Sequence, residues 1–249
     1  MDINNLFSVK NKRILLTGAS GELGKALLID LISAGAYTHA ITTELSHLSD
    51  FKNNDLVTIY ACNLTDDIQV KNTCQQITQN FGVDIIINCA GTSIDGNIDE
   101  ISDADFFHVF DLNLFAAFRV IKYCLPSMKS NNGGVILNVA SALASRAAPY
   151  CSAYAASKSA IVHFTKCLSL ELAPWKIRAN CISPGYFLSS LTREFITSDS
   201  GKTFINNQIP MRRLLDLHEL IPMIRLMISG AGSYMTGANI VIDGGLSNW

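Results

Sequence analysis

Apolar stretches of strand length alternate with longer amphipathic stretches along most of this chain. Stretches with the length and composition of strands are 13–16, 37–42, 57–62, 84–88, 134–139, 177–183 and 239–243. Amphipathic stretches that predict helices are 25–34, 68–81, 103–128 and 153–172. The short uncharged strands fit burial on both faces of a sheet. This alternation predicts an α/β fold, a doubly wound parallel sheet of Rossmann type with helices on both faces.

The organisation of the chain favours one domain. It has 249 residues, with no internal repeat and no linker rich in Pro or Ser, so we predict a single dinucleotide-binding domain over 1–249. The segment 188–207 differs, because it is polar, rich in Ser and Thr, and without a strong period. We expect a mobile substrate flap here, within 186–212.

Composition narrows the classes of partner. The net charge is −2, from 19 basic and 21 acidic residues, which gives no basic field for nucleic acid. Seven cysteines without a CxxC pair indicate reduced thiols, and five histidines lack zinc-like spacing, so no metal site is expected. Residues 1–11 lack an apolar signal core, and no later stretch reaches membrane-spanning length. We expect a soluble cytoplasmic protein that binds a small molecule.

A glycine-rich turn follows the first predicted strand. Residues 17–24 read TGASGELG, and an amphipathic helix follows them. Glycines allow a tight turn and close approach of the backbone, while the N-terminus of a helix attracts a pyrophosphate. This strand–turn–helix context predicts a dinucleotide site.

Candidate chemistry is concentrated downstream of that turn. Tyr154 and Lys158 are four residues apart in a predicted helix, so phenol and ammonium share one face. The ammonium would favour the phenolate and lower the pKa of Tyr154, making it a general acid or base. Such a pair alone is more often part of a solvated face. Ser141 follows the strand 134–139, where α/β sites form, although a lone Ser there is usually a cap or turn residue. Asn113 lies inside a predicted helix, where Asn is unfavourable; the alternatives are a functional role, a helix kink or a satisfied core amide.

Together these motifs resemble the short-chain dehydrogenase/reductase family over 12–243. The matching segments are TGASGELG at 17–24, NCAG at 88–91, YAASK at 154–158 and PG at 184–185, with Asn113 and Ser141 in the expected order. Segments at 209–214, 234–237 and 243–245 look most like the 3-oxoacyl-[acyl-carrier-protein] reductase branch. The resemblance implies hydride transfer between a nicotinamide and a carbonyl carbon. It assigns proton donation to Tyr154, tuning of Tyr154 and ribose binding to Lys158, oxyanion stabilisation to Ser141, and a water relay to Asn113.

The same resemblance implies a set of cofactor-binding positions. They are Gly18, Ser20, Gly21, Leu23, Thr42, Thr43, Asn63, Leu64, Asn88, Ala90, Gly91, Tyr154, Lys158, Pro184, Gly185, Phe187 and Ser189. Members that prefer NAD place an acid after the second strand, where this chain has Thr42 and Thr43. We therefore expect NADP(H) to be favoured over NAD(H), although Glu44 is nearby and no Arg is adjacent.

Two departures from the family pattern bear on function. Glu22 stands at the middle glycine of TGxxxGxG, and Cys89 at the second Asn of NNAG. Either Glu22 points to solvent and suits the helix dipole, with Gly21 restoring flexibility, or it weakens cofactor binding. Three functions stay open: a 3-oxoacyl-[acyl-carrier-protein] reductase, a reductase of a sugar or small ketone, and a cofactor-binding regulatory protein without turnover. Leu143, Tyr150 and Tyr186 are expected beside the substrate.

The predicted helix 103–128 carries more apolar residues than one sheet contact requires. We expect a homo-oligomer, a dimer or tetramer as the family resemblance implies, formed through this helix and the one that carries Tyr154. The alternative is that Phe106, Phe107 and Phe110 are core residues.

Overall fold

Seven parallel strands form one sheet in the computed structural model, which describes residues 3–248. The strands are β1 (Arg13–Thr17), β2 (Tyr37–Thr42), β3 (Val57–Ala61), β4 (Ile85–Asn88), β5 (Gly134–Val139), β6 (Ile177–Pro184) and β7 (Asn239–Ile242). Their order is β3-β2-β1-β4-β5-β6-β7. All four residues of β4 are buried, as expected of a strand covered on both faces.

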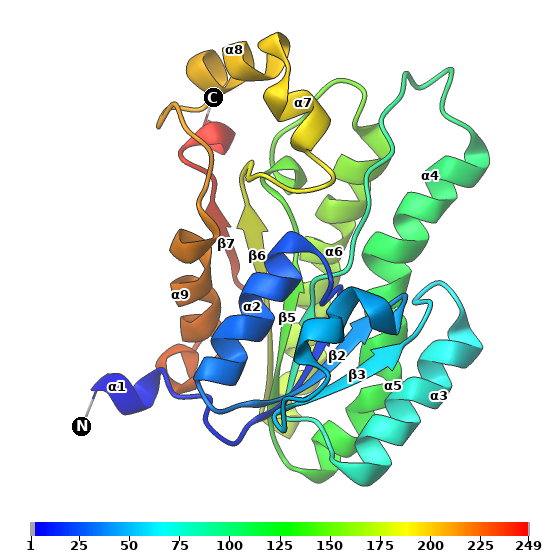
Figure 1. Ribbon diagram of the computed structural model, residues 1–249, viewed down its shortest axis with the longest axis vertical. Coiled ribbons are helices and arrows are strands. Elements are labelled where there is room, and N and C mark those ends of the chain that lie inside the picture. Colours follow the sequence, from blue (N-terminus) through cyan, green and yellow to red (C-terminus); the bar gives the residue numbers. More distant parts are fainter. Residues whose placement is uncertain (1–2, 249) are drawn as a thin grey trace.

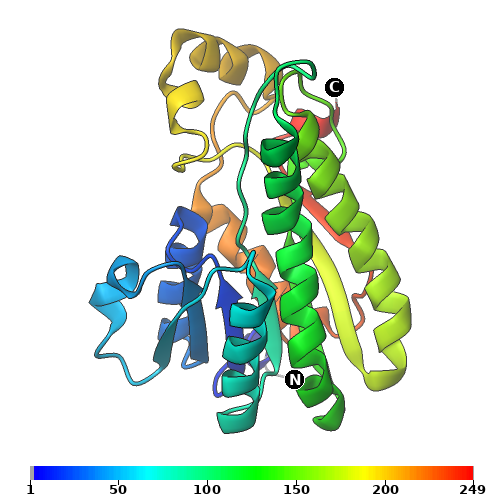
Figure 2. The same cartoon turned by 90° about the vertical axis from the view of Figure 1, so that its right-hand side faces the viewer.

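Helices cover both faces of the sheet (Figures 1 and 2). One core joins buried side chains of α2 (Glu22–Ser33) and α9 (Leu217–Ile228) to the sheet. A second core does the same for α3 (Asp67–Asn80), α5 (Ala116–Ser130) and α6 (Ser152–Leu172). The predicted doubly wound architecture is confirmed.

The strand order reverses next to β1, which pairs with β2 on one side and β4 on the other. In this register Thr17 lies opposite Asn88, so the turn after β1 and the loop after β4 leave the sheet side by side. Ligands of open parallel sheets bind at this kind of crevice, outside the carboxyl ends of the strands.

The expected helix over 103–128 is divided into three parts. These are α4 (Asp103–Phe110), a π-helical turn η2 (Asp111–Phe115), and α5, which continues to Ser130. A π-helical turn widens the helix by one residue, and such turns are frequent at functional sites.

The segment from 188 to 207 is helical where we expected irregular structure. It forms α7 (Arg193–Thr197) and α8 (Asp199–Gln208), and the Ser198 hydroxyl caps α8 by accepting from the Gly201 N–H at 3.0 Å. Both views place α7 and α8 at the same end of the molecule as the loop that precedes α4 (Figures 1 and 2). Helices α7 and α8 bury few side chains, so their sequence is mostly polar and shows no apolar periodicity that predicts a helix.

Helix α9 was also not predicted. Asp216 and Glu219 form a capping box at its start, and Pro222 lies inside it. Single-turn helices complete the chain: α1 (Ile3–Leu6), η3 (Ala142–Ala144), η4 (Ala173–Trp175), η5 (Gly230–Gly232) and η6 (Leu246–Asn248), with the longer 3-10 segment η1 (Leu45–Phe51). Within 3–248, no helix is both long and apolar enough to cross a bilayer.

Candidate active site

A cavity of about 880 Å³ lies at the carboxyl ends of the strands. Its wall includes every predicted catalytic and cofactor position except Asn88 and Asn113. Residues from the turn after β1, the end of β2, α6 and the segment after β6 therefore meet around one space.

The glycine-rich turn has the close backbone approach that a dinucleotide needs. Gly18 adopts φ +64, and a Cβ there would lie 2.7 Å from the Ala90 nitrogen. The Thr17 hydroxyl oxygen accepts hydrogen bonds from the Cys89 and Ala90 N–H groups at 3.1 and 3.2 Å, which fixes the two loops together. Helix α2 begins directly after Gly21, with its first N–H groups at the cavity. The cradle and the helix N-terminus fit a pyrophosphate.

The end of the cavity beside β2 carries hydroxyl groups. Thr42 is buried, and its hydroxyl donates to Ser20 Oγ at 3.0 Å, whereas Thr43 is exposed on the wall. Asn63 and Leu64, which follow β3, also line the cavity, and their contact with a cofactor stays a prediction. Glu44 is not among the described residues of the wall.

Ser141, Tyr154 and Lys158 line the cavity together. Ser141 follows β5 and its hydroxyl oxygen accepts from the Leu143 N–H at 3.1 Å. Helix α6 carries the other two, and Lys158 Nζ lies 5.7 Å from the centroid of the Tyr154 ring. The ammonium donates to the Val139 carbonyl at 2.9 Å and is 4% exposed, so its position is fixed from β5.

Burial determines the protonation of this pair. It lowers the pKa of Lys158 to about 8. It also raises the pKa of Tyr154 above its usual 10, although a hydrogen bond with Ser141 opposes that rise. The expected lowering of the Tyr154 pKa by Lys158 is wrong for this structure. Because Lys158 bonds to Val139 and sits over the phenol ring, desolvation of the phenolate dominates.

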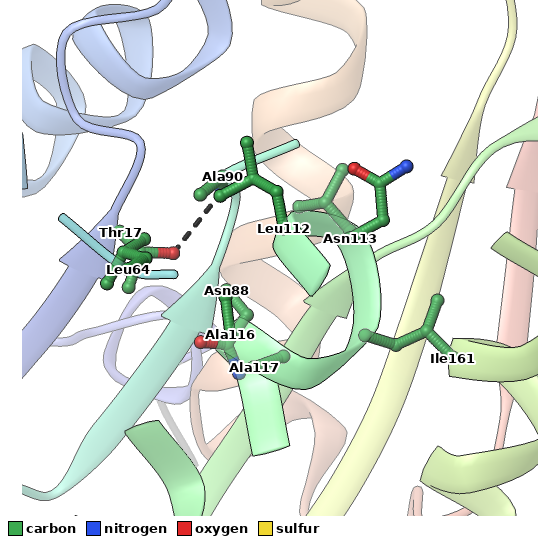
Figure 3. A pocket seen from close by; sticks show the side chains of 10 residues that line it. Thr17, Leu64, Asn88, Ala90, Leu112, Asn113, Ala116, Ala117 and Ile161 are labelled. Carbon is green, nitrogen blue, oxygen red and sulfur yellow. Dashed lines mark hydrogen bonds between the residues drawn. The ribbon is translucent and has the colours of Figure 1, made fainter. Parts of the chain in front are cut away.

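Asn113 lies beside a separate void of about 10 Å³, in the π-helical turn (Figure 3). Its Oδ1 accepts from the Thr92 N–H at 2.8 Å, and its Nδ2 donates to Thr92 O and Ser157 Oγ, both at 2.9 Å. Both amide hydrogens are thus used by the protein. This geometry fits the satisfied core amide that the sequence left open, and a role of Asn113 in a water relay stays a prediction.

Asn88 lines the same small void and not the large cavity (Figure 3). Its Nδ2 donates to Asn138 Oδ1 at 2.8 Å, and Asn138 Nδ2 donates to Thr165 Oγ1 at 2.8 Å. This buried chain of amides connects β4, β5 and α6. The Asn88 amide thus lies in the sheet–helix interface, and a part for Asn88 in cofactor binding stays a prediction.

Glu22 does not simply face solvent, as one interpretation held. Its Oε1 accepts a hydrogen bond from the Ser190 N–H at 2.8 Å, and both residues line the cavity. The carboxylate therefore connects the first turn of α2 to the segment that follows β6.

Leu143, Tyr150 and Tyr186 also line the cavity, and their position beside a substrate stays a prediction. Sequence reasoning missed Phe195 and Phe204, which pack against Tyr186 and face the same space. It also missed Asp95, on the loop after β4. No local motif distinguishes this Asp from a surface residue.

Comparisons with known proteins agree with this geometry. A family model described as "Enoyl-(Acyl carrier protein) reductase" matches residues 32–247. The chain is 32% identical to nodulation protein G of Rhizobium sp. (strain N33) over 245 residues, 97% of this chain and 99% of that protein. It belongs to the short-chain dehydrogenase/reductase family.

Other relatives of this dehydrogenase/reductase extend the comparison. It is 30% identical over 244 residues to the 3-oxoacyl-[acyl-carrier-protein] reductase FabG of Thermotoga maritima, covering 96% of this chain and 98% of that protein. Its fold superposes on the RhlG/NADP active-site complex of Pseudomonas aeruginosa with a TM-score of 0.90 at 26% identity, covering 98% and 99% of the two chains. The expectation that the protein is an oxidoreductase is confirmed.

Proposed function

We propose that this protein reduces a carbonyl group with NADP(H), or oxidises the corresponding secondary alcohol. One observation carries the proposal: Ser141, Tyr154 and Lys158 line the same cavity as the glycine cradle. A proton donor and an oxyanion-binding hydroxyl thus share a space with a pyrophosphate-binding turn.

The chemistry divides between cofactor and protein. NADPH, when bound, supplies a hydride to the carbonyl carbon. Ser141 and Tyr154 hydrogen-bond the carbonyl oxygen, and Tyr154 gives it a proton as negative charge develops. The raised pKa of Tyr154 keeps the phenol protonated at neutral pH, which suits a donor. When Tyr154 gives up its proton, the ammonium of Lys158 stabilises the negative charge of the phenolate, because it lies over the Tyr154 ring.

We propose NADP(H) as the preferred cofactor. The wall near β2 is formed by Ser20, Thr42, Thr43 and Asn63, with no acid among its described residues. A ribose diol would find no carboxylate partner there, whereas a 2′-phosphate would meet hydroxyl and amide donors. The related Pseudomonas aeruginosa protein is described with NADP.

A cofactor-binding protein without turnover is the second candidate, and Glu22 is the observation that favours it. A carboxylate at the first turn of α2 lies close to where a pyrophosphate would bind and opposes that charge. The complete Ser141–Tyr154–Lys158 group favours the enzyme over this alternative.

We propose that the protein assembles with copies of itself in the cytoplasm. Phe107, Phe115 and Phe118 are 67%, 46% and 45% exposed on α4, η2 and α5, and Leu170 of α6 is 79% exposed. Phe106 and Phe110 are half-buried and belong to none of the cores, so the alternative that this group forms core is wrong. All seven cysteines are free thiols, which fits a reducing compartment.

Parallel titrations with NADPH and NADH, followed by nicotinamide fluorescence, test the cofactor assignment. A carbonyl panel assayed by NADPH oxidation then tests turnover. Tighter binding of NADPH with turnover of a ketone is the expected result. Binding without turnover of any carbonyl would favour the cofactor-binding protein without turnover. Binding of neither cofactor would refute both that candidate and the carbonyl reductase.

A further inference from the structure

The cavity wall contains a carboxylate, Asp95, that forms no ion pair within residues 3–248. Asp95 is exposed on the wall, and its Oδ1 accepts from Ser93 Oγ at 2.8 Å and from Cys151 Sγ at 3.7 Å. The Gly96 N–H donates to the Tyr150 carbonyl at 2.9 Å, which ties this loop to the segment that precedes α6. Asp95 is therefore held against the segment that precedes α6, in the same cavity wall as Tyr154.

The negative charge of Asp95 acts on the phenol of Tyr154. After burial and Cys151, its carboxylate is a further, smaller cause of the raised pKa of Tyr154, and it acts on Tyr186 in the same direction. An anionic substrate that presented its carbonyl to Tyr154 would therefore sit in the field of Asp95 as well.

Cations are scarce at this end of the cavity. Among residues 3–248, Lys158 is the sole Lys or Arg in the cavity wall, and its ammonium is buried against Val139. Arg146 lies nearby but outside the wall, with its guanidinium 5.9 Å from the Phe204 ring centroid and bonded to Gln208 at 2.8 Å. Apart from His108 on α4, a substrate carboxylate or phosphate would thus meet no unpaired basic side chain among the described residues of the wall.

The same cavity wall contains a cluster of aromatic rings. The Tyr186 and Phe204 centroids are 5.1 Å apart, and those of Phe195 and Phe204 are 5.5 Å apart, with all three rings facing the cavity. Burial raises the pKa of Tyr186 to about 12, so this ring stays an uncharged phenol. Apolar or aromatic substrate groups would bury surface against these rings.

From this pairing we propose that the substrate is an uncharged ketone with an apolar body, and that Asp95 excludes ketones carrying a carboxylate or phosphate. The inference rests on the proposed carbonyl chemistry and names its substrate class. Phosphorylated sugars and sugar acids are thereby disfavoured, and neutral ketones are favoured.

A matched pair of ligands tests whether Asp95 excludes anionic ketones, which we call the charge rule. Methyl 4-acetylbenzoate and 4-acetylbenzoate share one aryl ketone and differ by a negative charge. Their affinities are measured by calorimetry on the protein with NADP⁺ present, where no reduction occurs. We expect the ester to bind about tenfold tighter or more, since an unpaired anion beside Asp95 loses on the order of one factor of ten.

Two variants test whether the charge of Asp95 causes the preference for the ester. Asp95→Asn keeps a side-chain oxygen for Ser93 and Cys151 and removes the charge, so the preference for the ester should fall to within about threefold. Asp99→Asn, the same change on an exposed residue of this loop outside the wall, should leave the preference intact.

Three results would overturn the inference: equal or tighter binding of the acid, an ester preference that survives Asp95→Asn, and failure of the ester to bind. Arg146→Gln identifies the cation if the acid binds tighter. Turnover with NADPH is scored separately, so binding with the expected charge preference but no reduction would refute the proposed function and leave the charge rule standing.

Discussion

Glu22 and Ser190 are joined by a hydrogen bond of 2.8 Å between the Glu22 carboxylate and the Ser190 N–H, although 168 positions separate them. Glu22 opens α2, whereas Ser190 belongs to the segment between β6 and α7. A position where the family pattern has glycine thus joins the turn after β1 to the segment that follows β6. The departure from the pattern creates a contact at the same time as it places a negative charge near the pyrophosphate site.

Glu22→Gln separates the charge of this residue from its hydrogen bond. The amide oxygen can still accept from Ser190, while the repulsion of the pyrophosphate is removed. We expect NADPH to bind more tightly by about 1 kcal/mol, roughly fivefold in Kd, for a partly exposed charge. Nicotinamide fluorescence measures the change, and Glu171→Gln on the exposed side of α6 is the control. An unchanged or weaker affinity would show that Glu22 does not oppose the cofactor.

Two glycines of the same turn should respond differently to alanine. A Cβ on Gly24 would lie 2.1 Å from the Gly18 carbonyl oxygen, whereas a Cβ on Gly21 would meet the same oxygen at 3.5 Å. Gly24→Ala should lower the free energy of unfolding by about 2 kcal/mol or more and impair NADPH binding. Gly21→Ala should stay within about 1 kcal/mol of the parent protein. Urea denaturation compares the two, and equal effects would contradict the packing described for this turn.

Most of the fold could be predicted from the sequence, because buried strands and amphipathic helices have distinct periods. The bounds of β2 and β5 match the prediction, and those of α6 differ by one residue. The π-helical turn could not be predicted, since apolar spacing continues through it. Helices α7 and α8 were missed because capping and local hydrogen bonds, rather than a wide apolar face, define them.

The site, like the fold, could be predicted only in part. Motif residues such as Ser141 and Tyr154 could be placed at the ends of strands and on a helix face. Contacts between segments that are distant in the sequence could not be predicted. The Glu22–Ser190 hydrogen bond and the position of Asp95 were therefore missed. The pKa of Tyr154 was predicted in the wrong direction, because spacing along a helix says nothing about how deeply a phenol is buried.

His39 makes the stability of the protein sensitive to acid. It is 3% exposed on β2, its Nε2 has no hydrogen-bond partner in the described structure, and burial lowers its pKa to about 4. The ordinary pKa of about 6.5 applies in the unfolded chain, which therefore binds more protons between these values. The free energy of unfolding should fall as pH drops from 6.5 toward 4, by about 1–2 kcal/mol from this residue at pH 5.

His39→Phe should remove that part of the acid sensitivity. The new ring would lie near Tyr60 and Phe81, which already pack around the imidazole. Urea denaturation at pH 7 and pH 5 gives the difference for each variant, with His218→Phe on an exposed position as the control. The same loss of stability in the parent protein and in His39→Phe would exclude His39 as its source.

Self-association should depend on the exposed rings of α4 and α5. A charge at the centre of an apolar contact is costly to bury, so Phe118→Asp should raise the dissociation constant of the oligomer about tenfold or more. Ile29→Asp, on α2 and 58% exposed, introduces the same charge elsewhere and should have no such effect. Light scattering over a concentration series measures both. A monomeric parent protein at micromolar concentration would refute the oligomer.

Transfer of deuterium from NADPH that carries deuterium at both C4 positions of the nicotinamide ring to an uncharged aryl ketone tests the central claim most directly. The transfer is compared between the parent protein and Tyr154→Phe. The parent should yield the alcohol with deuterium on the carbinol carbon. Tyr154→Phe should slow this roughly hundredfold or more while NADPH binds almost normally, because only the proton donor is lost. Tyr234→Phe, on a fully exposed tyrosine, should behave like the parent. Near-normal reduction by Tyr154→Phe, or an alcohol without deuterium at that carbon, would contradict the account.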